Sequence, residues 1–175
     1  MNLIGKKLLK IFLKLASLKL KGDWILLGGT VLPALGVEVR STTDIDVAKI
    51  GESDHSDTLQ LMELAEKLGL PVETINQAGS YFLNKIPDFQ KHLVVLHRGT
   101  HATFYRPDLY LFVQLKIQRM SESDLQDCIE MIKFEKGFRN FESLKKLLSA
   151  QIRRSSSAEK IKRLEKLGEI IKIKK

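Results

Sequence analysis

Hydrophobic residues recur every three or four positions near both ends of the chain, whereas the centre carries short apolar runs bounded by turn residues. The first spacing predicts amphipathic helices, and the second predicts strands. Predicted strands cover residues 24–27, 41–48, 72–75, 92–97 and 103–105. Predicted helices cover residues 3–20, 30–35, 57–68, 108–119, 124–134, 141–152 and 157–171. Strands in the centre and helices at the ends predict an α+β fold with a helical C-terminal part.

Charge is distributed unevenly along the 175 residues, whose formal net charge is +8. Residues 1–22 carry six Lys and no acidic residue, and residues 145–175 carry eleven bases against three Glu. Residues 23–144 hold 12 bases and 18 acidic residues, a net charge of −6. The basic ends suit a polyanionic partner such as RNA. Because the C-terminal segment has no aromatic residue to stack on bases, sequence-specific reading of a single strand is not predicted.

Three segments are expected along the chain: a basic helix in residues 1–22 that packs on the core, a core domain in residues 23–135, and a basic helical extension in residues 136–175. The Lys face of the first helix is expected to be solvated, with nucleic acid and a membrane surface as alternative partners. No apolar run approaches the roughly 20 residues of a membrane span, so no span is expected and the favoured interpretation has no membrane partner. The single Cys128 excludes a disulfide framework and fits a reducing compartment, which predicts a cytoplasmic protein.

Two acidic residues, Asp44 and Asp46, alternate with Ile45 and Val47 in the second predicted strand. Residues two apart in a strand project from the same face, so the carboxylates stand side by side while the apolar residues enter the core. Neighbouring carboxylates repel each other unless a proton or a cation lies between them. Oxygen ligands of this kind prefer a hard ion, Mg²⁺ or Mn²⁺, which such sites bind together with substrate phosphates.

A phosphate-binding turn is predicted at Gly28, Gly29 and Thr30, where the first strand runs into the start of a helix. Glycines leave the backbone N–H groups uncovered, and the helix dipole favours an anion at this point. Taken alone, the glycines fit an ordinary turn and the carboxylates fit a solvated edge strand. Together, and joined by one short helix, they predict phosphoryl or nucleotidyl transfer.

The motif Leu27-Gly28-Gly29-Thr30, followed by Gly36 and by the run from Arg40 through Thr43-Asp44-Ile45-Asp46 to Val47, resembles the nucleotidyltransferase fold of the polymerase-β superfamily. It looks most like the small bacterial and archaeal branch that includes AbiEii-type toxins. A second similarity to that branch is a helical Lys116, followed by Arg119 and by Asp124-Leu125-Gln126-Asp127. The resemblance covers residues 24–135 and implies a mixed sheet flanked by helices.

The resemblance also implies a role for each matching residue. Asp44 and Asp46 would be catalytic metal ligands, and Lys116 would be a catalytic contact to phosphate. The nucleotide-binding residues that it implies are Gly28, Gly29, Thr30, Arg40, Thr43, Lys116, Arg119, Asp124 and Asp127. It implies an NTP as substrate, Mg²⁺ or Mn²⁺ as cofactor, and an antitoxin protein as partner if the chain is a toxin.

Helix geometry constrains the second motif. Lys116 and Asp127 are eleven residues apart, which places them at nearly the same azimuth of one helix but about 16 Å apart along it. One straight helix cannot bring both to one phosphate. Ser121 with Asp124, or Ser123 alone, can cap a new helix, so the chain is expected to turn back between them. The alternatives are a dipole-complementing role for Asp124 and a plain surface role for the two basic residues.

The superfamily usually supplies a third carboxylate from a later strand, but the strand predicted at residues 92–97 contains none. Glu73 and Asp88 are the nearest acidic residues, and His97 is an alternative substitute. This departure keeps a second interpretation open, in which the chain binds a nucleotide or a partner without turnover.

The sequence thus predicts a cytoplasmic, Mg²⁺-dependent nucleotidyltransferase that moves a nucleoside monophosphate from an NTP to an acceptor. RNA is the favoured acceptor, and tRNA in particular, because both ends of the chain are basic. A toxin of a toxin–antitoxin pair is one form of this function. The alternatives are an enzyme that modifies a protein or a small molecule, a degenerate nucleotide binder, and an RNA-binding module with a vestigial site. Steep salt dependence of RNA affinity without an NTP requirement would favour the last.

Overall fold

Contacts within the structure, a computed structural model, divide the chain into two units, Met1–Pro107 and Asp108–Lys175. The structure describes residues 4–37 and 42–173. The division between the units falls after Pro107, whereas the sequence places segment boundaries after residues 22 and 135, and those boundaries stay predictions.

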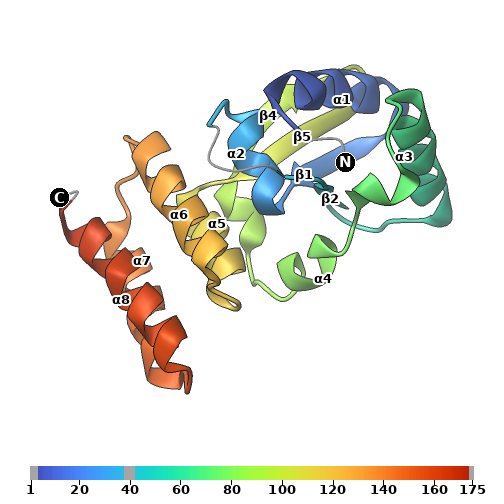
Figure 1. Ribbon diagram of the computed structural model, residues 1–175. Coiled ribbons are helices and arrows are strands. Elements are labelled where there is room, and N and C mark those ends of the chain that lie inside the picture. Colours follow the sequence, from blue (N-terminus) through green and yellow to red (C-terminus); the bar gives the residue numbers. More distant parts are fainter. Residues whose placement is uncertain (1–3, 38–41, 174–175) are drawn as a thin grey trace. The chain divides into compact units, whose positions relative to one another are not determined.

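The first unit is built on a five-stranded mixed sheet in the order β3-β2-β1-β5-β4 (Figure 1). Its strands are β1 (Gly22–Leu26), β2 (Ile45–Lys49), β3 (Ile75–Asn76), β4 (Leu93–Arg98) and β5 (Ala102–Pro107). β1 runs antiparallel to β2 and parallel to β5, β2 pairs with β3 in parallel, and β4 pairs with β5 antiparallel. The predicted α+β fold, with a mixed sheet flanked by helices, is therefore confirmed.

Helix α1 (Lys6–Lys19) packs its apolar stripe on one face of this sheet (Figure 1). Phe12 on α1 meets Phe104 on β5 edge to face, with ring centroids 6.0 Å apart. Phe104 in turn stacks on Trp24, its register partner on β1, at 6.4 Å. All three rings are fully buried, so they form the centre of the core. The Lys residues of the opposite stripe of α1 are exposed to solvent.

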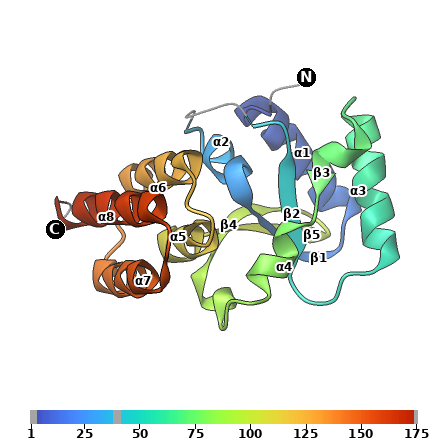
Figure 2. The ribbon, with the colours of Figure 1, turned by 60° about the horizontal axis from the view of Figure 1, so that its bottom comes forward.

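Further helices cover both faces of the sheet. Helix α3 (His55–Lys67) lies beside α1 and adds Leu61 and Leu64 to the same core. Helix α4 (Gly79–Leu83) contacts β2 from the other face, as Figures 1 and 2 show. The short elements between the strands are 3₁₀ turns η1 (Gly28–Thr30), η2 (Val72–Thr74) and η3 (Phe89–His92), and helix α2 (Val31–Ala34).

The second unit consists of four helices. They are α5 (Leu109–Ile117), α6 (Glu122–Phe134), α7 (Phe141–Arg154) and α8 (Ala158–Ile173). Contacts join α5 to α6 and α7, and join α8 to α6 and α7, so each helix has two helical neighbours. The helical C-terminal part expected from the sequence is confirmed.

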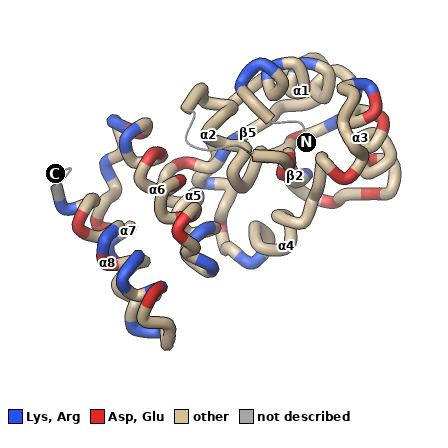
Figure 3. The backbone as a smooth tube through the Cα atoms, in the orientation of Figure 1, with Lys and Arg blue, Asp and Glu red and all other residues tan. Residues whose placement is uncertain are grey.

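Basic side chains are concentrated on α1 in the first unit and on α7 and α8 in the second (Figure 3). On α8 they are interspersed with Glu, which lowers the local charge. In the described part of the chain, no helix combines the length and the apolar character that crossing a membrane requires.

Candidate functional site

The predicted phosphate turn begins where β1 ends. Leu27 still donates its backbone N–H to the carbonyl of Asp46, at 2.9 Å. Gly28 then adopts φ +61°, a left-handed conformation that L side chains rarely adopt. This residue turns the chain out of the strand and into η1, where Gly29 is half-buried.

Gly28 is also the point at which the Asp46 carboxylate touches the turn. A Cβ atom added at Gly28 would overlap Asp46 Oδ2 and lie 3.0 Å from Asp46 Cγ. The absence of a side chain therefore lets the carboxylate lie against the backbone of the turn. The glycine turn and one of the two predicted metal ligands form a single local site.

Thr30 ties this turn to the start of β2. Its side chain is fully buried, and its Oγ1 donates to the carbonyl oxygen of Asp44 at 3.1 Å. Thr30 Oγ1 also accepts a hydrogen bond from the backbone N–H of Asp46, at 3.2 Å. One hydroxyl thus contacts the backbone of both acidic residues and sets their distance from the turn. The structure assigns Thr30 this positioning contact, which the sequence motif does not specify.

The two acidic residues differ in exposure. Asp44 is exposed and lies just before β2, whereas Asp46 is half-buried within the strand. Ile45 and Val47 are fully buried, as the predicted alternation requires. The metal-binding roles of the two carboxylates stay predictions. The backbone of both residues is bonded to Thr30 in the turn, and the Asp46 carboxylate lies against Gly28. Thr43 is half-buried beside Asp44, and Arg40 lies outside the described residues.

The third carboxylate that the sequence resemblance implies has no counterpart on the later strands. β3, β4 and β5 contain no acidic residue, and the register partner of Asp46 on β3 is Asn76. Glu73 lies exposed in η2, and Asp88 is exposed and paired with Lys91. Over residues 4–37 and 42–173, no group of three or more His, Cys, Asp or Glu side chains could hold a metal ion.

His97 does not substitute for that carboxylate. Its Nε2 lies 3.1 Å from Ser17 Oγ on α1, and Ser17 Oγ donates to the carbonyl of Lys14. The register places His97 opposite Phe104, which is level with Trp24 on β1. Because Gly28 lies four residues beyond Trp24, about 13 Å of strand separates the histidine from the turn. His97 therefore joins α1 to the sheet rather than serving the site.

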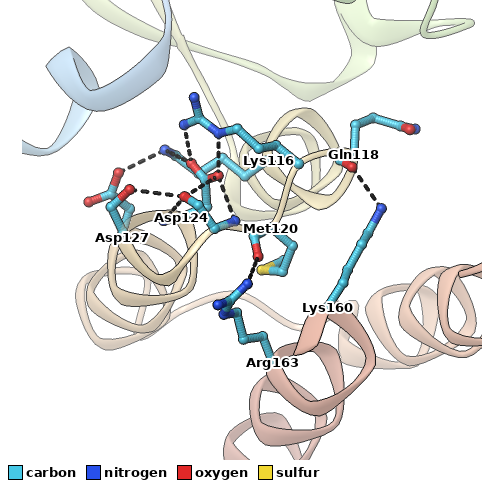
Figure 4. Close-up of polar contacts among 10 residues, drawn as sticks. Lys116, Gln118, Met120, Asp124, Asp127, Lys160 and Arg163 are labelled. Atoms are coloured by element: carbon cyan, nitrogen blue, oxygen red, sulfur yellow. Dashed lines mark hydrogen bonds and ion pairs between the residues drawn. The ribbon is translucent and has the colours of Figure 1, made fainter. Parts of the chain in front are cut away.

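In the second unit, α5 and α6 bring Lys116 and Asp127 together (Figure 4). Lys116 Nζ donates to Asp127 Oδ2 at 2.7 Å and to Asp124 Oδ1 at 3.1 Å. Lys116 exposes 7% of its side chain, and each aspartate exposes 1%. The chain turns back between the two helices, as the spacing predicts, because Ser121 and Asp124 form a capping box at the start of α6.

Arg119 completes this cluster, which we call the Lys116 cluster (Lys116, Arg119, Asp124 and Asp127). Its Nε and Nη2 donate to the two oxygens of Asp124 at 2.7 and 2.8 Å, while 72% of its side chain stays exposed. Two cations face two carboxylates, so the charges balance. This balance explains how two aspartates are buried. Arg119 is the cation of the cluster that reaches solvent.

The hydrogen bonds of Asp124 give folding a pH dependence. Burial alone would raise the pKa of Asp124, but bonds from Arg119 and Ser121 and the charge of Lys116 lower it well below the usual value of 3.8. The unfolded chain therefore binds a proton at a higher pH than the folded chain does. Stability is fully present above about pH 4 and falls as the pH drops further.

We therefore expect Asp124→Asn to flatten the acid loss of stability. Urea unfolding between about pH 7 and about pH 3 measures it. The wild type should lose free energy of unfolding as the pH falls, and the variant should lose less over the same range. Asp88→Asn is the control, because the exposed Asp88–Lys91 pair is screened by water. Equal slopes in wild type and Asp124→Asn would contradict this account.

Two bases of α8 support the turn between α5 and α6. Lys160 Nζ donates to the carbonyl of Gln118 at 2.7 Å, and Arg163 Nη1 donates to the carbonyl of Met120 at 3.3 Å (Figure 4). Met120 has φ +43°, which marks a tight turn. These contacts show that part of the C-terminal positive charge stabilises the unit itself. Composition alone does not distinguish these two bases from their solvated neighbours.

Cys128 is fully buried on α6 beside the Lys116 cluster. Burial raises the pKa of the Cys128 thiol to about 12; the charge of Lys116 acts in the opposite direction, and the charges of Asp124 and Asp127 add to the rise. The thiol therefore stays protonated and contributes to packing rather than to nucleophilic chemistry.

Comparison with known protein families gives a match over nearly the whole chain. The model of a family described as "nucleotidyltransferase of unknown function (DUF6036)" matches residues 6–174. The match spans both units and includes the glycine turn, the two carboxylates and the Lys116 cluster. No curated protein and no solved structure matches the chain.

Proposed function

Since the chain belongs to this family of nucleotidyltransferases, we propose that it is a metal-dependent enzyme that transfers a nucleoside monophosphate from an NTP to RNA. The contact between Asp46 and Gly28 carries this proposal. It puts a carboxylate against a backbone turn that has no side chain in the way. A nucleotidyltransferase needs these two elements together, because its metal and its phosphate bind side by side.

Mg²⁺ or Mn²⁺ is the proposed cofactor, and Asp44 and Asp46 would hold it. Their oxygens suit a hard cation, and two protein carboxylates leave coordination positions for substrate phosphates and water. Bound there, the ion would neutralise charge on the phosphates and lower the barrier to attack. Thr30 contributes by fixing the backbone of both aspartates.

The proposed reaction is a displacement at phosphorus. An acceptor hydroxyl oxygen forms a bond to the α-phosphorus, and the bond from that phosphorus to the oxygen bridging to the β-phosphate breaks. Pyrophosphate leaves with that oxygen, and the hydroxyl proton passes to solvent. The backbone of Gly28 and Gly29 would hold the triphosphate. Within the second unit, 72% of the Arg119 side chain is exposed, whereas Lys116 is bonded to two buried aspartates, and the phosphate roles of both residues stay predictions from the sequence.

RNA is the proposed acceptor because the chain has exposed Lys and Arg residues besides those that stabilise the protein itself. Lys7, Lys10 and Lys14 line the solvent side of α1. On α7, Arg153 and Arg154 are exposed near its C-terminal end. A phosphate backbone binds such surfaces with a strong salt dependence. The tRNA acceptor, the cytoplasmic location and the toxin role stay predictions from the sequence and from its similarity to AbiEii-type toxins.

Nucleotide binding with and without Mg²⁺ tests the site directly. By calorimetry, Mg²⁺ should strengthen NTP binding by the wild type. Asp46→Asn should weaken this Mg²⁺ effect by about 10- to 100-fold or more, because even the loss of a residue that only hydrogen-bonds to a metal ligand lowers metal affinity by that factor. Asp23→Asn is the matched control, because Asp23 is an exposed acid at the opposite end of β1. The same Mg²⁺ effect in both variants would contradict the assignment of Asp46.

A catalytically degenerate member of the family is the second candidate function. The described strands β3, β4 and β5 offer no third carboxylate, and this observation favours it. Such a protein would bind NTP or RNA without releasing pyrophosphate. Pyrophosphate release by the wild type in the presence of RNA, protein or small-molecule acceptors separates the two candidates and identifies the acceptor class.

A further inference from the structure

Helix α4 presents two aromatic side chains to solvent. Tyr81 exposes 61% of its surface and Phe82 exposes 53%. Their ring centroids lie 5.3 Å apart, and the rings meet edge to face at 83°. On the inner side of the helix, Gly79 packs against Leu27 and Leu83 is fully buried. The helix is thus held by its inner face while the two rings stay outside.

A cation accompanies the rings. Lys85 Nζ lies 3.8 Å from the centroid of the Tyr81 ring and donates to Tyr81 Oη at 2.6 Å. An aromatic surface beside an ammonium group is the combination that binds single-stranded nucleic acid, because bases stack on the rings and phosphates meet the charge.

The chain places this surface next to the candidate site of the first unit. α4 starts three residues after Asn76, the register partner of Asp46. Gly79 touches Leu27, which directly precedes Gly28. A helix of five residues is only about 7.5 Å long, so both aromatic residues follow closely on the segment that contacts Leu27 and β2. Figure 2 shows α4 beside β2.

The surface is narrow, which favours a base over a protein. In the stretch from residue 77 to residue 92, the other large apolar residues are covered, since Leu83 and Phe89 are buried and Ile86 is half-buried. Two exposed rings are enough to stack on one or two nucleobases. A stable protein interface needs roughly 800 Å² from each partner, which two side chains do not supply.

We propose that Tyr81 and Phe82 bind an unpaired base of the RNA acceptor and that Lys85 meets the adjoining phosphate. This inference rests on the proposed function, because it names how the acceptor approaches the same site. In this proposal, α4 holds the single-stranded RNA beside the carboxylates. Duplex RNA, whose bases are stacked on each other, offers no free base and should not use this surface.

Binding of labelled RNA to the full chain, without NTP, tests the proposal. The probes are a single strand of about 12 nucleotides and the corresponding duplex, followed by fluorescence anisotropy. The Tyr81→Ala/Phe82→Ala variant should bind the single strand about tenfold more weakly or worse, and should bind the duplex as the wild type does. Lys85→Gln should lower the salt slope of single-strand binding by about one unit.

Two further variants keep the result interpretable. Leu59→Ala/Met62→Ala removes exposed apolar side chains of α3 and should leave single-strand binding unchanged. Tyr81→Phe/Phe82→Tyr keeps both rings and should restore binding close to the wild-type value. Equal single-strand binding by Tyr81→Ala/Phe82→Ala and wild type would overturn the proposal. So would an equal loss of single-strand binding in the α3 variant.

Failure of this inference and failure of the proposed function give different results. If the aromatic variant still binds and modifies RNA like the wild type, α4 is not the acceptor surface but the enzyme assignment stands. If the wild type binds the single strand through α4 but never transfers a nucleotide, the proposed function fails and the α4 site stands.

Discussion

Gly28→Ala is expected to abolish most nucleotidyl transfer while the chain still folds. The new Cβ would overlap Asp46 Oδ2, so the carboxylate has to move away from the turn. A displacement of about 1 Å at a reacting centre costs on the order of 100-fold in rate. The positive φ of Gly28 adds about 1–2 kcal/mol of conformational strain, which lowers stability but does not by itself remove activity.

Gly69→Ala separates these two effects. Gly69 has φ +67°, close to the +61° of Gly28, but a Cβ there meets nothing within 4 Å. This variant should lose a similar free energy of unfolding from backbone strain and keep full transfer activity. Both are measured by urea unfolding and by initial rates with Mg²⁺ and labelled NTP. If the two alanine variants lose activity equally, contact with Asp46 is not what makes Gly28 necessary.

Lys116→Met is expected to destabilise the second unit strongly. It leaves Asp124 and Asp127 buried at 1% exposure with one cation too few. Removing one partner of a buried ion pair costs about 3–5 kcal/mol. The measurement is the free energy of unfolding in urea. Lys133→Met is the matched control on α6, because the Lys133 side chain is 59% exposed and its pair with Glu130 is therefore worth about 0–1 kcal/mol.

Adding Asp127→Asn to Lys116→Met tests the charge balance itself. The double variant removes one cation and one anion, so it should recover part of the stability that Lys116→Met loses. The interaction energy from the double-mutant cycle reports the pair directly. Additive losses would show that the two side chains do not depend on each other, contrary to the contact at 2.7 Å.

Most elements of the fold are predictable from the sequence because their periodicity is local. The helix predicted at residues 141–152 is observed at Phe141–Arg154, and the strand predicted at residues 92–97 is observed at Leu93–Arg98. The strand predicted at residues 72–75 is mostly the turn η2, followed by a two-residue strand. α4 is not predicted, since five residues are too few to show a helical period.

The candidate site is predictable in its residue types but not in its contacts. Asp44, Asp46 and Gly28 follow from the strand and turn pattern. The close contact between the Asp46 carboxylate and Gly28, which leaves no room for a side chain at residue 28, depends on how β2 pairs with β1. No local sequence pattern contains this pairing. The exposure of Tyr81 is likewise set by tertiary packing, because an aromatic residue in a sequence most often enters a core.

Label transfer from an α-labelled NTP tests the central claim most directly. Wild type and Asp44→Ala/Asp46→Ala would each be incubated with Mg²⁺, each of the NTPs and total RNA or cell lysate. The account predicts label on RNA from the wild type and a rate lower by about 1,000-fold or more in the double variant, since a metal site supplies several kcal/mol of transition-state stabilisation. Equal labelling by both proteins, or no label on any acceptor while the wild type binds NTP, would contradict it.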